Sequence, residues 1–470
     1  MPYSYTWAAL LGLLATAGAA QGQPAAFGAV NTYSTGSGTY PYALAVADVN
    51  GDSRPDLLTA NYFSSTVSVL LSTGAGSFGT VTIYSAATSS NLTGIAVADI
   101  NGDSKPDILT TNSGTNTVGV LLGTGMGSFG TFTTYSTGAN SHPAGIVVAD
   151  VNGDGKPDIL TANPGTSTVG MLPGIGTGSF GTLTTLSAVG QPNALVAADV
   201  NSDGKLDILT ANPGTNTVGV LLGAGTGSFG SVSTYDTGTG SQPNALAVAD
   251  VNNDGRLDLL TANRNSTAGV LLGIGTGSFG PANSFNTGSS PVGVAVADVN
   301  GDGQPDLLTA NNSNLAVVLL GTGTGSFGPM AAFSAGSGTY PFTIAVADVN
   351  GDRRPDLLTA NQGNSTVGVL LNTGTYTPLA ATTGLDAATV ALYPNPGHGH
   401  VQVVVPAVAG TTAVQAILLD ALGRAVRQQT AALPAAGTTL TLETAGLAVG
   451  IYTLRLQAGA AVLARRVVLE

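Results

Sequence analysis

The stretch at residues 43–61, ALAVADVNGDSRPDLLTAN, decides the fold, because the chain repeats it seven times. Its centre is a nine-residue pattern, D-x-N-x-D-x-x-x-D, with an apolar run on either side. The pattern begins at intervals of 48 to 51 residues, at Asp48, Asp99, Asp150, Asp199, Asp250, Asp298 and Asp348. A period of this length that contains several short apolar segments is typical of an array of small β-sheets.

Side-chain oxygens recur at positions one, three, five and nine of each pattern, so they can converge on one centre. A site built only from oxygen selects a hard cation, and Ca²⁺ fits best. The sequence therefore predicts up to seven calcium sites. Their predicted side-chain ligands are Asp48, Asn50, Asp52 and Asp56; Asp99, Asn101, Asp103 and Asp107; Asp150, Asn152, Asp154 and Asp158; Asp199, Asn201, Asp203 and Asp207; Asp250, Asn252, Asp254 and Asp258; Asp298, Asn300, Asp302 and Asp306; and Asp348, Asn350, Asp352 and Asp356.

The acidic residues are concentrated in these loops. Three aspartates in each of seven patterns account for 21 of the 26 Asp and Glu residues, and the formal net charge is −13. Seven divalent cations would offset that charge, so the acidity indicates metal loops and not a surface for basic partners. Only 8% of the residues are charged, and no Lys-rich or Arg-rich patch occurs, so nucleic acid is excluded as a ligand.

Each repeat contains four short segments with the alternation of β-strands. In the second copy they are GIAVADI (94–100), DILTTN (107–112), TVGVLLG (117–123) and SFGTFTTYS (128–136). Four strands in a period of about 50 residues are typical of a propeller blade. We therefore expect an all-β protein with a seven-bladed β-propeller over residues 21–372.

The two ends of the repeat array complement each other. The last copy runs through TVGVLLN (366–372) and then lacks the SFG strand that ends the other six copies. Residues 26–34, AFGAVNTYS, match that missing strand and precede the first loop. The N-terminal segment is therefore expected to form the outer strand of blade seven and to close the ring without a free edge.

The beginning of the chain has the features of an exported protein. Residues 7–20, WAALLGLLATAGAA, form an apolar run that is too short to span a bilayer and ends in small residues. We predict a signal peptide at residues 1–20, although MPYSY lacks the usual basic residues, and no transmembrane segment. The chain has no cysteine, so bound Ca²⁺ would take the stabilising role that disulfides have in other secreted proteins.

These loops, with the GSFG turns at Gly76, Gly127, Gly178, Gly227, Gly277 and Gly325, resemble FG-GAP or VCBS-type repeats, as found in integrin α-subunit propellers. The resemblance covers residues 26–372. It implies that a position-seven backbone carbonyl completes each calcium site. The residues concerned are Arg54, Lys105, Lys156, Lys205, Arg256, Gln304 and Arg354.

Other kinds of loop share part of this pattern. An EF-hand would need Glu at position twelve, where the first copy has Thr59, and flanking helices. Dockerin modules use a similar spacing, but in two copies on helices. Loops of Asx turns that bind no metal are the remaining alternative.

The pattern changes after a Thr-rich and Ala-rich linker at residues 373–389. Residues 390–470 show alternating strands with Gly turns, as in a small immunoglobulin-like β-sandwich. LYPNP (392–396), DALGR (420–424), GLAVGIYTL (446–454) and the pair Arg465 and Arg466 resemble the C-terminal sorting domain of the type IX secretion system. This resemblance implies that the secretion machinery is a partner and that the product is secreted or attached to the cell surface.

Catalytic candidates are few, since the only histidines are His142, His398 and His400. We therefore expect no enzyme, but a monomeric adhesion or ligand-binding module for an extracellular protein or glycan. A carbohydrate-binding module for polysaccharide capture, a purely structural surface protein and a polysaccharide-active enzyme are the alternatives.

Strand topology predicts where a ligand would bind. In an antiparallel blade the Asp loops lie on one face, so the opposite face is free for ligands. Its loops hold an uneven share of aromatic residues near blades seven and one, which could stack on sugars or pack against neighbouring loops. These residues are Tyr40, Tyr42, Tyr62, Phe63, Tyr340 and Phe342.

Overall fold

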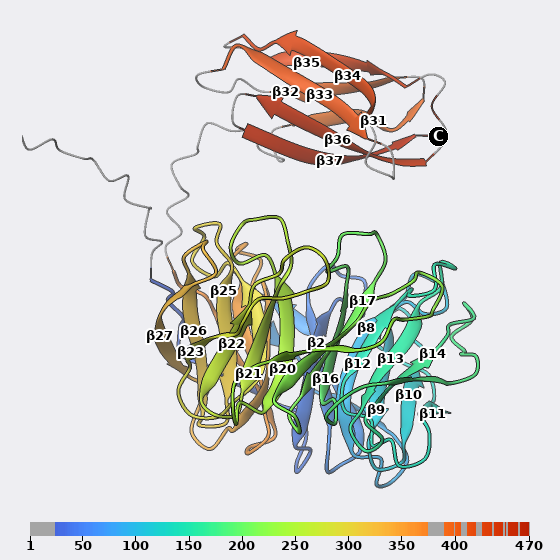
Figure 1. Cartoon of the computed structure of the whole chain (residues 1–470), viewed down its shortest axis with the longest axis vertical. Helices are drawn as coiled ribbons and strands as arrows, with labels where there is room; N and C mark the ends of the chain where they lie inside the picture. The colour runs from blue at the N-terminus through green and yellow to red at the C-terminus, as the bar shows by residue number, and fades with distance from the viewer. Residues whose placement is uncertain are drawn as a thin grey trace, which may run out of the picture. The chain divides into compact units, whose positions relative to one another are not determined.

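The computed structural model describes residues 24–374, 390–398, 400–405, 411–419, 425–434, 437–444, 447, 450–458 and 461–469. These residues form β-strands and no helix, and they belong to two compact units, Met1–Tyr376 and Thr377–Glu470 (Figure 1). The predicted signal peptide and most of the predicted linker, 375–389, lie outside the described residues. In the part of the chain that is described, no helix is long and apolar enough to cross a membrane.

The first unit consists of seven four-stranded antiparallel sheets that resemble propeller blades. Sheet one has the order β2 (Pro41–Ala47), β3 (Asp56–Asn61), β4 (Thr66–Leu70) and β7 (Thr82–Ser85), with a small hairpin of β5 (Ser72–Gly74) and β6 (Ser77–Phe78) before its last strand. Five further sheets repeat this order. They are β8 (Leu92–Ala98), β9 (Asp107–Asn112), β10 (Thr117–Leu121) and β11 (Thr133–Ser136); β12 (Ile146–Ala149), β13 (Asp158–Asn163), β14 (Thr168–Leu172) and β15 (Thr184–Ser187); β16 (Ala194–Ala198), β17 (Asp207–Asn212), β18 (Thr217–Leu221) and β19 (Ser233–Asp236); β20 (Pro243–Ala249), β21 (Asp258–Asn263), β22 (Thr267–Leu271) and β23 (Asn283–Asn286); and β24 (Pro291–Ala297), β25 (Asp306–Asn311), β26 (Leu315–Gly321) and β27 (Phe327–Ser334).

Burial explains why the second strand of each sheet has so uniform a sequence. All six residues of β3 are buried, and so are those of the corresponding strand in every other sheet. Such a strand lies between two neighbouring sheets, so both of its faces must fit an apolar layer. The outer strands, such as β7, are mostly exposed and accordingly polar.

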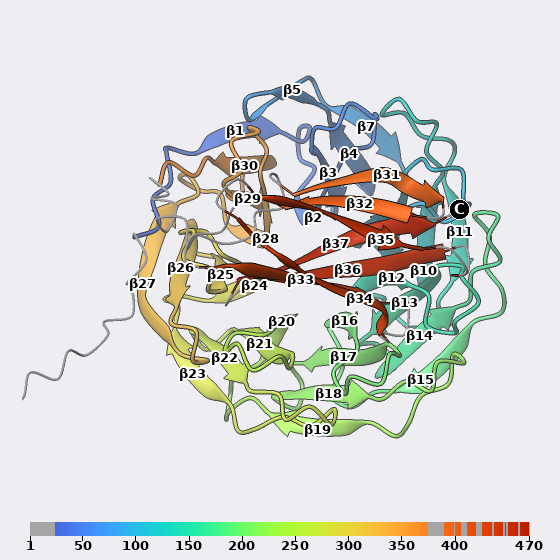
Figure 2. The same cartoon turned by 90° about the horizontal axis from the view of Figure 1, so that it is seen from above.

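The first strands of the sheets contact one another in sequence order. Strand β2 packs on β8, β8 on β12, and so on through β16, β20 and β24 to β28 (Pro341–Ala347), which returns to β2. The sheets therefore surround a common centre, with β2, β16 and β20 toward the inside and β19, β23 and β27 toward the outside (Figure 2). Thr343 donates a 2.8 Å hydrogen bond from its hydroxyl to the Tyr42 carbonyl across the junction of sheets seven and one.

Sheet seven combines both ends of the repeat array. Strands β28, β29 (Asp356–Asn361) and β30 (Thr366–Leu370) are completed by the N-terminal strand β1 (Asn31–Ser34), which pairs antiparallel with β30 from Asn31↔Val369 to Ser34↔Thr366. Phe27 forms a β-bridge with Asn372 and packs edge-to-face on Phe333, with 5.0 Å between ring centroids. The same edge-to-face contact joins Tyr33 to Phe78 and Tyr84 to Phe129 at other junctions.

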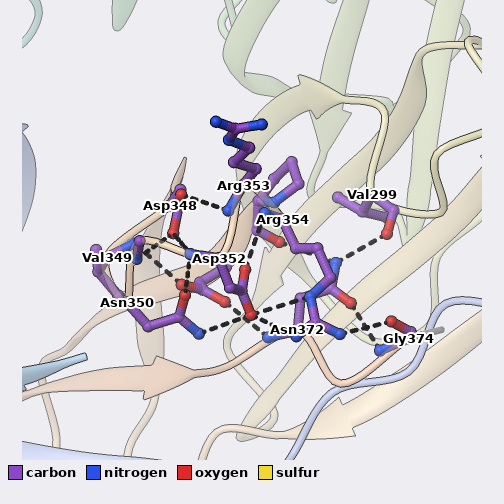
Figure 3. Close-up of polar contacts among 12 residues, drawn as sticks. Val299, Asp348, Val349, Asn350, Asp352, Arg353, Arg354, Asn372 and Gly374 are labelled. Atoms are coloured by element: carbon purple, nitrogen blue, oxygen red, sulfur yellow. Dashed lines mark hydrogen bonds and ion pairs between the residues drawn. The ribbon is translucent and has the colours of Figure 1, made fainter. Parts of the chain in front are cut away.

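A backbone hydrogen bond also links successive sheets. The first glycine of each GSFG turn has a positive φ and donates its N–H, at 3.0–3.3 Å, to the carbonyl of the second loop residue of the preceding sheet. Gly127, for example, donates to Val49. Sheet seven has no GSFG turn, and there the side-chain Nδ2 of Asn372 donates to the Val299 carbonyl at 2.8 Å (Figure 3). A side-chain amide thus replaces the missing backbone amide.

The second unit is also all-β. Its strands are β31 (Ala391–His398), β32 (His400–Val405), β33 (Ala413–Leu419), β34 (Ala425–Ala432), β35 (Thr438–Glu443), β36 (Gly450–Ala458) and β37 (Ala461–Leu469), in the order β34-β33-β36-β37-β31-β32-β35. One parallel pair, Gly397↔Leu469, joins β31 to β37. Buried Val and Leu residues of β32, β33, β35 and β36 form a single core. The DALGR motif lies outside the described residues.

The substitution Asn372→Ala tests the closure of the ring. Asn372 is buried, and its Nδ2 also donates to the Pro355 carbonyl at 3.1 Å, so alanine leaves two carbonyls without this donor. We expect the free energy of unfolding, measured by urea denaturation, to fall by about 1–3 kcal/mol. The control is Asn364→Ala, in the exposed loop between β29 and β30. Equal stability of the two variants would contradict this account of closure.

Candidate metal-binding loops

The seven Asp loops occupy equivalent places, since each connects the first strand of a sheet to the second. Position one is half-buried, and position five is exposed in the first five loops and half-buried in the last two. The aspartates at position nine start the second strands and are 0% exposed in all seven copies. One loop therefore contains carboxylates in three different environments.

The aspartate at position one organises the turn. Its Oδ2 accepts the N–H of position six at 2.7–2.8 Å in every loop. In the first loop, Asp48 Oδ1 also accepts the N–H of Gly51 at 2.7 Å. Position six has a positive φ, which suits glycine, yet Ser53 and Arg353 adopt it too. These charge-assisted bonds compensate for the strained backbone.

The side chains at positions three and five accept further backbone N–H groups of the loop. The side-chain oxygen at position three accepts the N–H of position five at 2.9–3.1 Å in each loop. Oδ1 at position five accepts the N–H of position seven at 2.8–3.0 Å. Figure 3 shows this arrangement in the seventh loop, with Asp348, Asn350 and Asp352 on one side of the turn. The loop backbone is thus ordered around oxygen atoms.

The aspartate at position nine has a structural role that sequence reasoning missed. Its Oδ2 accepts the N–H of position two at 2.8–3.1 Å. Its Oδ1 accepts, at 2.7–2.8 Å, an N–H at the end of the third strand of the same sheet. The donor is the second residue after that strand in six sheets and Gly321, the last residue of β26, in sheet six. For Asp56 the two donors are Val49 and Ser72. We call this pair of bonds the aspartate clamp, because it holds the Asp loop to the loop that follows the third strand.

Burial shifts the titration of the clamp aspartates. It raises the pKa of each, the two N–H donors lower it, and the carboxylates at positions five and one raise it again. The pKa reaches about 7 at Asp306 and about 6 at Asp356. Among the described residues, no Lys or Arg forms an ion pair with a clamp aspartate. Seven buried carboxylates are therefore stabilised only by neutral donors.

The basic residues at position seven pair with position five instead. Lys105, Lys156 and Lys205 lie 3.3–3.7 Å from the neighbouring aspartate, with both partners largely exposed, so these pairs add little stability. Arg354 is less exposed; its Nη2 lies 2.6 Å from Asp352 Oδ2, and its Nη1 donates to the Gly374 carbonyl at 2.8 Å. The seventh loop is thus tied to the end of the first unit (Figure 3).

The donor atoms and charge of the loops decide whether they suit a metal ion. Within the described residues, no group of three or more His, Asp or Glu side chains is arranged as a metal site, and the carboxylates accept backbone N–H groups instead. The donor set consists only of oxygen. In the first loop, Asp48 Oδ2 and Asp52 Oδ1 each accept one backbone N–H and so keep a second lone pair, whereas Asp48 Oδ1 already accepts three. A buried carboxylate without a cationic partner is costly, and a dication would remove that cost. The residues present therefore fit Ca²⁺, which would stabilise the loops by charge neutralisation.

The predicted ligand face gathers its aromatic residues as well. Tyr42 lies 4.0 Å from Phe342 and 5.5 Å from Tyr62 between ring centroids, and Tyr40 lies 4.5 Å from Phe63. Tyr340 is 48% exposed. Sequence reasoning overlooked Arg264, although it is the only Lys or Arg of residues 24–374 outside the Asp loops.

Comparison with known protein families supports the assignment of both units. The FG-GAP-like repeat matches residues 48–110, 101–161, 150–210, 199–261, 250–309 and 298–359. The secretion system C-terminal sorting domain matches residues 391–470. No curated protein matches the chain.

Two solved structures of one complex share the fold. The crystal structure of BBS1N in complex with ARL6DN, soaked with mercury, has a TM-score of 0.53 and 10% identity, and covers 76% of this chain and 99% of that chain. The same complex soaked with lead has a TM-score of 0.51 and 11% identity, with coverages of 74% and 97%. A lectin of Agrocybe aegerita that recognises non-reducing terminal N-acetylglucosamine has a TM-score of 0.47 and 22% identity, with coverages of 69% and 86%.

The repeat matches extend from the first Asp loop to the seventh and account for most of the chain. The sorting domain indicates export through the type IX secretion machinery. This chain therefore belongs to the family of FG-GAP-like repeat proteins and is a secreted or cell-surface protein.

Proposed function

We propose that this protein is a calcium-binding, seven-bladed β-propeller that acts outside the cell as a non-catalytic ligand-binding or adhesion module. The observation that carries the calcium proposal is the set of seven fully buried clamp aspartates without a cationic side-chain partner. Each ion would be held by the side-chain oxygens of positions one, three, five and nine and by the carbonyl of position seven. The ion would supply charge neutralisation and no reaction step.

The non-catalytic role is supported by the surroundings of the only histidine in the first unit. His142 is exposed, its Nδ1 lies 3.0 Å from the Ser113 carbonyl, and its backbone N–H donates to Asn116 Oδ1 at 2.9 Å. No carboxylate or hydroxyl partner that could form a catalytic pair appears among these contacts. A general base needs a partner within hydrogen-bond reach of a substrate proton.

The second unit is proposed to be an immunoglobulin-like β-sandwich that serves export and is removed afterwards. Its strands share one core, which supports folding independently of the repeats. The propeller is proposed to be a monomer whose ligand face is the edge opposite the Asp loops.

Removal of Ca²⁺ is the first test. A site filled to ten times its dissociation constant adds about 1.4 kcal/mol, so seven sites add roughly 10 kcal/mol. For a unit of this size we expect excess EDTA to lower the melting temperature by on the order of 10–20 °C, measured by calorimetry. Re-addition of Ca²⁺, but not of Na⁺ at equal ionic strength, should restore the melt. A melting curve that EDTA leaves unchanged would remove calcium from the account.

A matched pair of substitutions in the fourth loop separates the clamp from ion binding. Asp207→Ala removes the acceptor for the buried N–H groups of Val200 and Gly223. We expect it to cost about 1–3 kcal/mol for each unpaired N–H, even in EDTA. Asp203→Ala removes an exposed carboxylate that accepts only the exposed Lys205 N–H from the backbone, so in EDTA it should cost much less than Asp207→Ala, and its main effect should appear when Ca²⁺ is present. If both variants unfold like the wild type in EDTA, the clamp has no structural role.

Export provides a test of the second unit. The native host should release the full chain to the outside, whereas a chain that ends before Val390 should accumulate in the periplasm. Cell fractionation and the intact mass of the released protein measure both outcomes. Normal export of the shortened chain would contradict the sorting role, and a released protein that retains Glu470 would contradict processing.

A further inference from the structure

The aromatic residues of sheets seven and one form a continuous row on the edge opposite the Asp loops. We define the aromatic row as Tyr40, Phe63, Tyr62, Tyr42 and Phe342. Successive ring centroids lie 4.0–5.5 Å apart, and the Tyr62 N–H donates to the Tyr40 carbonyl at 3.0 Å, which holds two loops together.

The row runs from the rim toward the centre of the ring. Phe63, in the loop between β3 and β4, is 67% exposed. Tyr42 and Phe342 are half-buried and stand near the starts of β2 and β28, which are first strands of their sheets. The inner end of the row therefore lies near the common centre of the sheets on this edge.

A single guanidinium lies on the same edge as the aromatic row. Arg264, in the loop between β21 and β22 of sheet five, is exposed and donates from Nε and Nη2 to Asn244 Oδ1 at 3.1 and 2.7 Å. Arg264 directly follows the second strand of its sheet, as Tyr62 does, so both lie on the same edge. Burial raises the pKa of Tyr42, and the charge of Arg264 lowers it. Outside the Asp loops, Asp236 is the only acidic residue of residues 24–374; it ends the outer strand β19 and accepts the N–H of Gly238.

An unused donor accompanies the row in sheet seven. Gln362 is 7% exposed, and its Nε2 has no hydrogen-bond partner among the described residues. The Gln362 N–H donates to the Tyr340 carbonyl at 3.3 Å, which places this residue beside the aromatic row. Gln362 follows the second strand of its sheet, as Tyr62 and Arg264 do in theirs. A buried amide without a partner is costly unless a ligand supplies the acceptor.

We propose that this edge binds an acidic polysaccharide, whose sugar rings lie on the aromatic row and whose carboxylate pairs with Arg264. This inference rests on the proposed ligand-binding function and names its substrate class. Guanidinium and carboxylate groups match in shape and charge, and Asn244 orients the guanidinium. Gln362 would donate to a hydroxyl or ring oxygen of the sugar.

The surrounding loops favour a sugar over a protein partner. The segments STGSGTYP (34–41) and AGSGTYPF (335–342) contain small polar residues around the aromatic ones and no Leu, Ile, Met or Trp. A stable protein interface has an apolar core, whereas a sugar ring offers one C–H face and many hydroxyls. Aromatic rings among small hydrogen-bonding residues suit the second kind of surface.

The test measures binding of the calcium-loaded full chain to a hyaluronan octasaccharide by calorimetry, with the carboxyl-reduced octasaccharide as matched probe. We expect the acidic sugar to bind at least tenfold more tightly than the reduced one. Arg264→Gln should abolish that difference, while Arg353→Gln, an exposed basic residue on the opposite edge that is not a predicted metal ligand, should not. Tyr42→Ala should weaken the binding of both octasaccharides. The melting temperature of this variant shows whether it is folded.

The outcomes separate this inference from the function on which it rests. If the folded, calcium-loaded wild type binds neither sugar, the polysaccharide proposal is wrong and the calcium-binding propeller stands. Equal losses in Arg264→Gln and Arg353→Gln would show only nonspecific charge attraction and would overturn the assigned site. Binding of a protein partner that requires Tyr42 and Arg264, without sugar binding, would also overturn it.

Discussion

The structure depends on the second residue of each Asp loop, whose backbone is held from both sides. Its N–H donates to the buried carboxylate at position nine, and its carbonyl accepts the glycine N–H of the next sheet. One peptide segment thus forms a hydrogen bond within its own sheet and another to the neighbouring sheet. Because the arrangement recurs in all seven sheets, with Asn372 replacing the glycine at the last junction, a defect in one loop is transmitted to the adjacent sheet.

This constraint explains why most carboxylates lie in the Asp loops and few lie elsewhere on the surface. A buried aspartate accepts two N–H groups more strongly than a neutral side chain would, but it carries a charge into a region without a cationic residue. The raised pKa of Asp306, about 7, expresses that cost. A dication in the proposed sites would offset it. Binding and folding would then be linked without any disulfide, which the chain cannot form.

Much of the architecture could be predicted from the sequence, because the same strand pattern occurs in it seven times. Family matches confirm the FG-GAP-like resemblance and the sorting domain. Other features depend on three-dimensional contacts that no pattern displays. Position nine looked like a metal ligand only, because its two N–H donors lie on separate loops. The pairing of Arg264 with Asn244 joins residues from a loop and a strand, and neither belongs to a motif.

The number of bound ions tests the central claim most directly. Native mass spectrometry of the purified full chain, first stripped by a chelator and then titrated with Ca²⁺, counts the ions on each folded molecule. The account predicts seven Ca²⁺ per chain, and one ion fewer when Asp203 is replaced by alanine. A folded protein that binds no Ca²⁺, or that keeps the same number after this substitution, would contradict it.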